Sequence, residues 1–263
     1  MDHIEGTSIS LILSFRNEQQ VLIEFIGRVQ KALDPISVGY ELIFVNDDSN
    51  DKSLEILLDY HRKDSRIKII NMSRRFGHDR CVLAGISYAS GKAIAVMDTD
   101  LQDPPELLPK MYAECMRGAD IVYIIRLSRR GESMVKLWVT GLGYFLLNKA
   151  SPFIQKEAGD YRMFSREVAK YIVRMQDHNP FFRGMVTWVG FKQVNIPYHR
   201  ESRYAGVSHF PIFGGGPAKA FFQALIAFSE KPFVGMIFLG VFGIAFSLIS
   251  LLFSTVTLGL KST

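Results

Sequence analysis

Two carboxylates and an amide stand at alternate positions, Asp98, Asp100 and Gln102, directly after a short apolar run. Side chains alternate along an extended strand, so these groups point the same way where the strand ends. Oxygen ligands at this spacing suit Mg²⁺ or Mn²⁺, with phosphate oxygens of a substrate completing the coordination shell. The alternative is an aspartate that caps the next helix. The residues Asp103-Pro104-Pro105 that follow favour the metal site.

Polar segments also follow three earlier apolar runs, at Ser14–Glu18, Asn46–Ser49 and Ser73–His78. Two familiar phosphate motifs are absent from the sequence. No G-x-G-x-x-G follows the first apolar run, and the stretch from Gly85 to Lys92 has one residue too many for a P-loop. Phosphates are therefore expected to meet metal and side chains rather than a glycine loop.

These polar segments are positioned by apolar runs that alternate with amphipathic segments. The pattern predicts strands at 8–15, 41–46, 67–71, 93–97 and 120–125, and helices at 18–33, 53–63, 79–89 and 105–117. Such alternation indicates an α/β fold with a mostly parallel sheet and helices on both faces. Ligands of such sheets bind beyond the carboxyl ends of the strands, where the polar segments lie.

The composition excludes several classes of protein. The chain has 263 residues, of which 48% are hydrophobic and 22% charged, so it has enough apolar surface to fold. Two cysteines, Cys81 and Cys115, exclude a disulfide scaffold. The net charge of +5 and the pI of about 9.1 suit anionic partners, but they do not indicate nucleic acid. A mean hydropathy of +0.11 suggests a soluble part joined to a membrane part.

The membrane part is the uncharged run from Phe233 to Leu260. A helix of that length, at about 1.5 Å per residue, reaches about 42 Å and exceeds a hydrocarbon core of about 30 Å. Residues 213–232 contain large apolar groups between Lys219 and Lys231, and we expect an amphipathic segment in the membrane interface. The alternative is a helix packed on the soluble domain. Residues 1–212 then form the catalytic domain.

The acidic N-terminus lacks the flanks of a signal peptide, so the catalytic domain is expected in the cytoplasm. More lysines precede the membrane run than follow it, which agrees with this orientation.

The sequence resembles the inverting family 2 glycosyltransferases of the GT-A fold, and among them the polyprenyl-phosphate glycosyltransferases. The match covers nearly the whole chain. It is carried by the segments Phe44–Ser49, Arg75–His78, Met97–Glu106, Gly159–Arg162, Arg183-Gly184 and Trp188–Phe191.

The resemblance implies a role for each matching position. The base and ribose would lie against Ser14, Arg16, Glu18 and Asp47. Asp98 would meet the ribose or diphosphate, and Asp100 and Gln102 would bind Mg²⁺ or Mn²⁺. The remaining expected residues are Arg75 and Arg203 for the nucleotide sugar, Arg126 and Arg129 for the acceptor phosphate, and Asp160 for orienting acceptor or sugar.

The implied reaction moves one sugar from a nucleotide-diphosphate donor to a polyprenyl phosphate at the cytoplasmic face of a bacterial inner membrane. UDP-glucose is the favoured donor and GDP-mannose the next. A phosphate acceptor is already a nucleophile, so it needs charge neutralisation more than a strong base. Two alternatives stay open: a glycan or protein acceptor, for which Asp160 would be the base, and a non-catalytic nucleotide-sugar-binding scaffold. A homo-oligomer is also left open.

Overall fold

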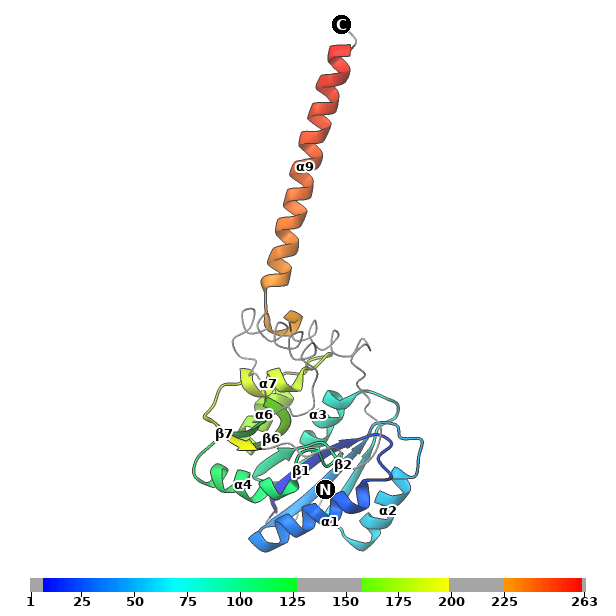
Figure 1. The fold of residues 1–263 in the computed structure, drawn as a ribbon, viewed down its shortest axis with the longest axis vertical. Helices are drawn as coiled ribbons and strands as arrows, with labels where there is room; N and C mark the ends of the chain where they lie inside the picture. The colour runs from blue at the N-terminus through cyan, green and yellow to red at the C-terminus, as the bar shows by residue number, and fades with distance from the viewer. Residues whose placement is uncertain (1–6, 127–157, 199–224, 262–263) are drawn as a thin grey trace.

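The structure is a computed structural model, and it describes residues 7–126, 158–198 and 225–261. A mixed sheet stands at the centre of an α/β domain, with helices on both faces, and one long helix leads away from that domain (Figure 1). The helices are α1 (Leu22–Leu33), α2 (Ser53–Lys63), α3 (His78–Tyr88), α4 (Leu108–Met116), α6 (Arg166–Arg174), α7 (Phe182–Trp188) and α9 (Lys231–Lys261), with 3₁₀ turns η1 (Asp34–Ile36) and η2 (Pro105–Leu107).

The sheet has seven strands in the order β3-β2-β1-β4-β6-β5-β7. Strands β1 to β4 pair in parallel, as does β5 with β7, while β6 runs antiparallel to both β4 and β5. The sequence therefore predicted the mostly parallel α/β class correctly. The bounds are β1 (Thr7–Phe15), β2 (Gly39–Asn46), β3 (Ile67–Asn71), β4 (Ala93–Val96), β5 (Ile121–Arg126), β6 (Ala158–Ser165) and β7 (Gln193–Tyr198).

Each face of the sheet has its own apolar core. Helices α1, α2 and α4 pack on one face, where Leu11 and Leu13 of β1 point. Helices α3, α6 and α7 pack on the other face against Ile12. Strands covered on both sides need apolar residues at successive positions, which explains the continuous apolar run of β2.

Several predicted element ends differ from the structure. The first helix begins at Leu22 rather than at Glu18, because residues 16–20 form a loop tied to the segment after β2. The predicted helix 105–117 is divided into the turn η2 and helix α4. Proline at a helix start is tolerated, but a second proline, Pro109, resets the start of α4. Cys81 is fully buried on α3, as expected.

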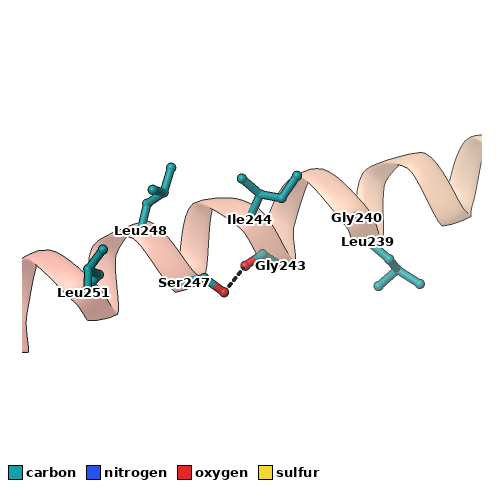
Figure 2. A pocket seen from close by; sticks show the side chains of 7 residues that line it. All are labelled: Leu239, Gly240, Gly243, Ile244, Ser247, Leu248 and Leu251. Atoms are coloured by element: carbon teal, nitrogen blue, oxygen red, sulfur yellow. Dashed lines mark hydrogen bonds between the residues drawn. The ribbon is translucent and has the colours of Figure 1, made fainter.

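Helix α9 is the described helix that is long and apolar enough to cross a membrane, over Lys231–Thr255. Its large side chains are exposed, with Leu239 at 72% and Leu252 at 69%. Figure 2 shows one side of it, where Gly240, Gly243 and Ser247 leave a shallow groove and the Ser247 hydroxyl donates to the Gly243 carbonyl at 2.9 Å. Small residues of this kind allow another helix to approach closely. Of the predicted juxtamembrane segment 213–232, residues 213–224 lie outside the described residues.

Candidate active site

The polar segments predicted to carry chemistry meet at one edge of the sheet. Strands β1, β2 and β4 end at Phe15, Asn46 and Val96, and all three run in the same direction. Parallel strands place their carboxyl ends at one edge, which is where ligands bind in such folds. Asp98 and Asp100 follow β4, Asp47 follows β2, and His78 begins α3 after β3.

Antiparallel strand β6 brings Asp160 to the same edge. Val96 of β4 lies opposite Arg162 of β6 in the register. Asp98 lies two residues past Val96, just beyond the end of β4, and Asp160 lies two residues before Arg162 in β6. An even step keeps a side chain on the same face of the sheet, so the two carboxylates come to face one another.

His78 lies between these two carboxylates. Its Nδ1 is 3.8 Å from Oδ1 of Asp98, and its Nε2 is 3.9 Å from Oδ2 of Asp160. Nε2 is buried and has no hydrogen-bond partner within the part of the chain that the structure describes. A buried polar atom in this condition is uncommon in a folded protein and is typical of a site that receives a ligand.

Asp160 forms a two-point ion pair with Arg183, the second residue of α7. Nε of Arg183 donates to Oδ1 at 2.6 Å, and its terminal nitrogen donates to Oδ2 at 2.5 Å. Buried Arg162 supports the pair, because its guanidinium donates to the backbone carbonyls of Gly159 at 3.1 Å and Arg183 at 3.2 Å. Arg183 thus holds the Asp160 carboxylate at both oxygens, and Arg162 holds the backbone of Arg183.

The electrostatics divide the two carboxylates. Burial by itself raises the pKa of Asp160, but the charge and hydrogen bonds of Arg183, with His78 and Arg162, hold that pKa well below its usual range. Burial raises the pKa of Asp98 to about 6, and His78 opposes that rise only in part because Asp160, Asp100 and Asp103 add to it. For His78, burial by itself lowers the pKa. The carboxylates of Asp98, Asp160 and Asp79 outweigh this effect and raise the pKa of His78 above its ordinary value.

The predicted metal-binding residues have the chemistry that a divalent cation requires. Asp100 is only 7% exposed, and its Oδ1 accepts a hydrogen bond from the Gln102 backbone at 3.1 Å. Leu101 between them has a φ of 57°, a strained value for a branched side chain and common at functional sites. The crowding of carboxylates that raises the pKa of Asp98 is the condition a cation would relieve.

Within the described ranges, no three Asp, Glu, His or Cys side chains form a group that could hold a metal ion. A site built on Asp100 and the amide oxygen of Gln102 would leave most coordination positions to phosphate oxygens and water. Mg²⁺ and Mn²⁺ commonly bind in this way, through one or two protein oxygens and a substrate phosphate.

At the positions predicted to bind the nucleoside, Asp47 joins the end of β2 to the loop after β3. Its Oδ1 accepts from the backbone N–H of Phe76 at 2.6 Å, and its Oδ2 accepts from Gly77 at 3.1 Å. The Cys81 thiol also hydrogen-bonds to Asp47 and Ser14, and burial raises the pKa of that thiol to about 12. Asp48 next to it has a φ of 59°, a left-handed conformation that aspartate adopts more readily than most residues.

Arg16 has the environment of a ligand-binding residue. Its Nε is buried without a hydrogen-bond partner among the described residues. Glu18 is held nearby through its backbone N–H, which donates to the Ser53 hydroxyl at 2.9 Å. Arg75 is exposed on the same rim. These positions agree with a nucleotide pocket, and their contacts with a nucleotide stay a prediction.

Three expected basic residues are not placed by these contacts. Arg129 and Arg203 lie outside the described residues, and Arg126 is known only as the last residue of β5, opposite Tyr198. Conversely, His78 and Arg183 belong to the cluster although the sequence assigned neither of them a role. Their motifs, Arg75–His78 and Arg183-Gly184, were the available signal, but the side-chain contacts in the structure are what show that they meet at Asp160.

Comparison with known proteins agrees with this geometry. The family model described as glycosyl transferase family 2 matches residues 10–173. The chain is 40% identical over 224 residues to the uncharacterized glycosyltransferase YkcC of Bacillus subtilis (strain 168), covering 85% of this chain and 69% of that protein. It is 33% identical over 203 residues to the bactoprenol glucosyl transferase of Shigella phage SfV, covering 77% of this chain and 66% of that protein.

Among solved structures, one similar fold is glucosyl-3-phosphoglycerate synthase from Mycobacterium tuberculosis, in complex with Mn²⁺, UDP and glucosyl-3-phosphoglycerate. Its TM-score is 0.57 at 18% identity, covering 84% of this chain and 78% of that one. The fold is therefore of the GT-A transferase type. The chain belongs to glycosyl transferase family 2. It spans about two thirds of the length of the two curated relatives.

Proposed function

We propose that the protein transfers a single sugar from a nucleotide-diphosphate donor to a polyprenyl phosphate, with inversion at the anomeric carbon. The observation that carries this proposal is that one chain contains both the sheet edge with Asp98, Asp100 and Asp160 and the apolar helix α9. The bactoprenol glucosyl transferase relative supports the same acceptor class.

The state of Asp160 favours a phosphate acceptor over a hydroxyl. A sugar or protein hydroxyl must lose its proton as it attacks, which calls for a base with an available lone pair and a suitable pKa. Asp160 is engaged at both oxygens by Arg183, and its pKa is held well below its usual range. A polyprenyl phosphate is already ionised, so a weakly basic, fixed carboxylate is sufficient to orient the reacting groups.

The chain's own residues divide the remaining work. Asp100 and Gln102 would hold Mg²⁺ or Mn²⁺, and the metal when bound would stabilise charge on the leaving diphosphate. Asp98 would bind the ribose or diphosphate, with the nucleoside between Ser14, Arg16, Glu18 and Asp47. The expected phosphate-binding cations are Arg75 and Arg203 for the donor and Arg126 and Arg129 for the acceptor.

UDP-glucose is the proposed donor and GDP-mannose the next. The named relatives include a glucosyl transferase, and a similar fold binds UDP with Mn²⁺. Helix α9 would anchor the enzyme in the bacterial inner membrane, with the catalytic domain of residues 1–212 on the cytoplasmic side, where nucleotide sugars are made. Whether the protein forms a homo-oligomer can be measured on the same purified sample.

The test is transfer of radiolabel from a panel of nucleotide sugars to undecaprenyl phosphate by detergent-purified protein, with Mg²⁺ or Mn²⁺. We expect one donor to label the lipid phase and Asp100→Ala to abolish the label. Loss of one group that stabilises developing charge commonly costs about 10²- to 10³-fold in rate. Chelation with EDTA should stop transfer, and restored Mg²⁺ or Mn²⁺ should show which ion is preferred.

Asp59→Ala is the matched control. Asp59 is an exposed carboxylate on α2, and its oxygen pairs with neighbouring Arg62. It should leave transfer unchanged. Labelling of a glycan or protein without added lipid phosphate would show the alternative acceptor class. Nucleotide binding with no transfer from any donor would leave a binding protein and refute the proposal.

A further inference from the structure

The segment that enters the membrane helix is seated on helix α7. The ring of Phe228 packs edge-on against Phe181, with ring centres 6.1 Å apart. A Cβ placed on Gly184 would come within 2.3 Å of the Phe228 ring, so glycine at this position allows the ring to approach the helix closely. Helix α9 begins at Lys231, three residues after Phe228. Helix α7 therefore lies where the chain approaches the bilayer.

Trp188 lies one turn further along the same face of α7. Residues four apart on a helix are neighbours on one face, so Trp188 follows Gly184 directly. Its side chain is not covered as Gly184 is, since Trp188 is 56% exposed. A large exposed indole thus lies one helical turn from the seat of Phe228. Figure 1 shows α7 on the side of the domain from which α9 leaves.

Two more exposed aromatic residues lie on α6 and just after α7. Tyr171 of α6 and Phe191, just after α7, are in ring contact at 5.7 Å, and both are exposed. We call Tyr171, Trp188 and Phe191 the aromatic corner. Tyrosine and tryptophan are enriched at membrane interfaces, because each ring has an apolar body and a polar tip.

The charge around the aromatic corner suits an anionic surface. Helix α6 carries three basic residues and one acidic residue, and the acidic Glu167 is paired with Lys170. Two exposed basic residues are close to these aromatic residues in the sequence: Arg174 follows Tyr171 on α6, and Lys192 directly follows Phe191. Basic side chains with aromatic neighbours are typical of surfaces that bind phospholipid headgroups.

We propose that the aromatic corner inserts into the headgroup region of the bilayer and gives the catalytic domain a second attachment besides α9. The inference rests on anchoring of the chain by α9 and does not depend on the sugar transferred. Two separated attachments, one through α9 and one through the corner, fix the tilt of the domain. The Asp98–Asp160 edge is then held at one height above the membrane.

The experiment uses the full chain reconstituted in vesicles of phosphatidylcholine and phosphatidylglycerol. The protein has two tryptophans, so Trp138→Phe leaves Trp188 as the single fluorophore. Interfacial side chains lie about 5–10 Å into the headgroup and acyl boundary, so lipids brominated near the headgroup should quench Trp188. We expect loss of Trp188 emission with these lipids and protection from aqueous acrylamide.

A matched probe is made by Ile23→Trp in a chain that also carries Trp138→Phe and Trp188→Phe. Ile23 is exposed to a similar extent, 59%, but it lies on α1, at the end of the domain away from α9 (Figure 1). This probe should be quenched by acrylamide and not by brominated lipid. If Trp138→Phe fails to fold, the difference in lipid quenching between the unmodified chain and Trp188→Phe gives the same answer.

Equal acrylamide quenching of the two probes, with no effect of brominated lipid, would overturn the proposal. Protection of Trp188 that grows with protein density in the vesicles, without lipid quenching, would also overturn it and would show contact with a second copy. Sugar transfer is measured on the same vesicles, so an inactive protein with a lipid-quenched Trp188 would refute the proposed function alone.

Discussion

At the amino end of the parallel strands, Glu41 is fully buried and surrounded by donors, whereas at the carboxyl end Asp98 shares His78 with Asp160 and has further carboxylates near it. Glu41 accepts from the Ser10 hydroxyl and Lys68 ammonium at 2.5 Å each, and from the Ser90 backbone at 2.6 Å. Burial raises the pKa of Glu41, but these bonds lower it below the usual value. Burial and neighbouring carboxylates raise the pKa of Asp98 to about 6.

The charge of Glu41 is satisfied within the fold, whereas the carboxylates near Asp98 lie where a ligand would bind. At the amino edge each bond of Glu41 connects two strands or a strand and a loop, so the network joins β1, β2, β3 and the turn before β4. At the carboxyl edge, a buried nitrogen of His78 has no hydrogen-bond partner among residues 7–126, 158–198 and 225–261, and Leu101 is strained. Such conditions cost stability and are found where function requires them.

The largest expected effect is the loss of folding stability when Glu41, at the amino edge, is replaced. Glu41→Ala removes a buried charge and leaves Lys68, Ser10 and Ser90 without their acceptor. Removing one partner of a buried ion pair typically costs about 3–5 kcal/mol, and we expect about 3 because Lys68 is partly exposed. Chemical unfolding of the detergent-purified protein measures the loss.

Glu55→Ala is the control for this change, since Glu55 is an exposed carboxylate on α2. Surface changes of this kind stay within about 0.5 kcal/mol. If Glu41→Ala were as stable as Glu55→Ala, the amino edge would not hold the fold in the way described.

The second prediction disturbs the carboxyl edge. Arg183→Gln removes the charge and the two-point hydrogen bonding that hold the pKa of Asp160 low. Burial then acts unopposed by Arg183, so the pKa of Asp160 rises. Transfer that needs ionised Asp160 should fall by about tenfold to a hundredfold, as for other residues that orient a functional group. Its acid limb should move to higher pH.

Arg183→Lys distinguishes charge from geometry at this position. Lysine keeps the charge but not the planar two-point contact, so transfer should recover in part while the acid limb returns toward that of the unmodified enzyme. An acid limb that does not move in Arg183→Gln would show that the protonation state of Asp160 does not limit transfer. Unfolding of each variant is measured alongside.

The smallest effect concerns the pH dependence of stability. The pKa of Glu41 is lowered in the folded state, so its contribution is present above the unfolded value of about 4.5 and is lost as the pH falls through the lower folded value. The unmodified protein should therefore lose stability between pH 5 and acid conditions. Glu41→Gln should flatten that part of the curve, because the titrating carboxylate is removed.

Strands β1 to β5 and helices α1 to α4 could be predicted from the sequence, because these strands are short apolar runs and these helices have an apolar face. The edge that carries the polar segments followed from the parallel order of strands near β1. Strand β6 was not predicted, since Gly159–Ser165 mixes charged and apolar residues. Those charges are accommodated by partners far away in the chain, such as Arg183 for Asp160.

The candidate site was predictable as a set of residues and not as a set of contacts. Asp98, Asp100 and Asp160 stand out by their motifs, and the structure brings them to one edge. The seat of Asp47 on the Phe76–Gly77 backbone depends on how two loops meet, which no local pattern in the sequence encodes. His78 is similar, because an ordinary packed histidine and one between two carboxylates have the same local sequence.

The register of β6 against β4 limits how this enzyme can change over evolution. Asp98 and Asp160 face each other because each lies an even number of residues from the Val96–Arg162 pair. A single-residue insertion or deletion between Asp160 and Arg162 would turn the carboxylate to the opposite face of the sheet while every residue type was retained. Relatives that keep this chemistry are therefore expected to vary here by substitution, and to place their length changes in the loops on either side.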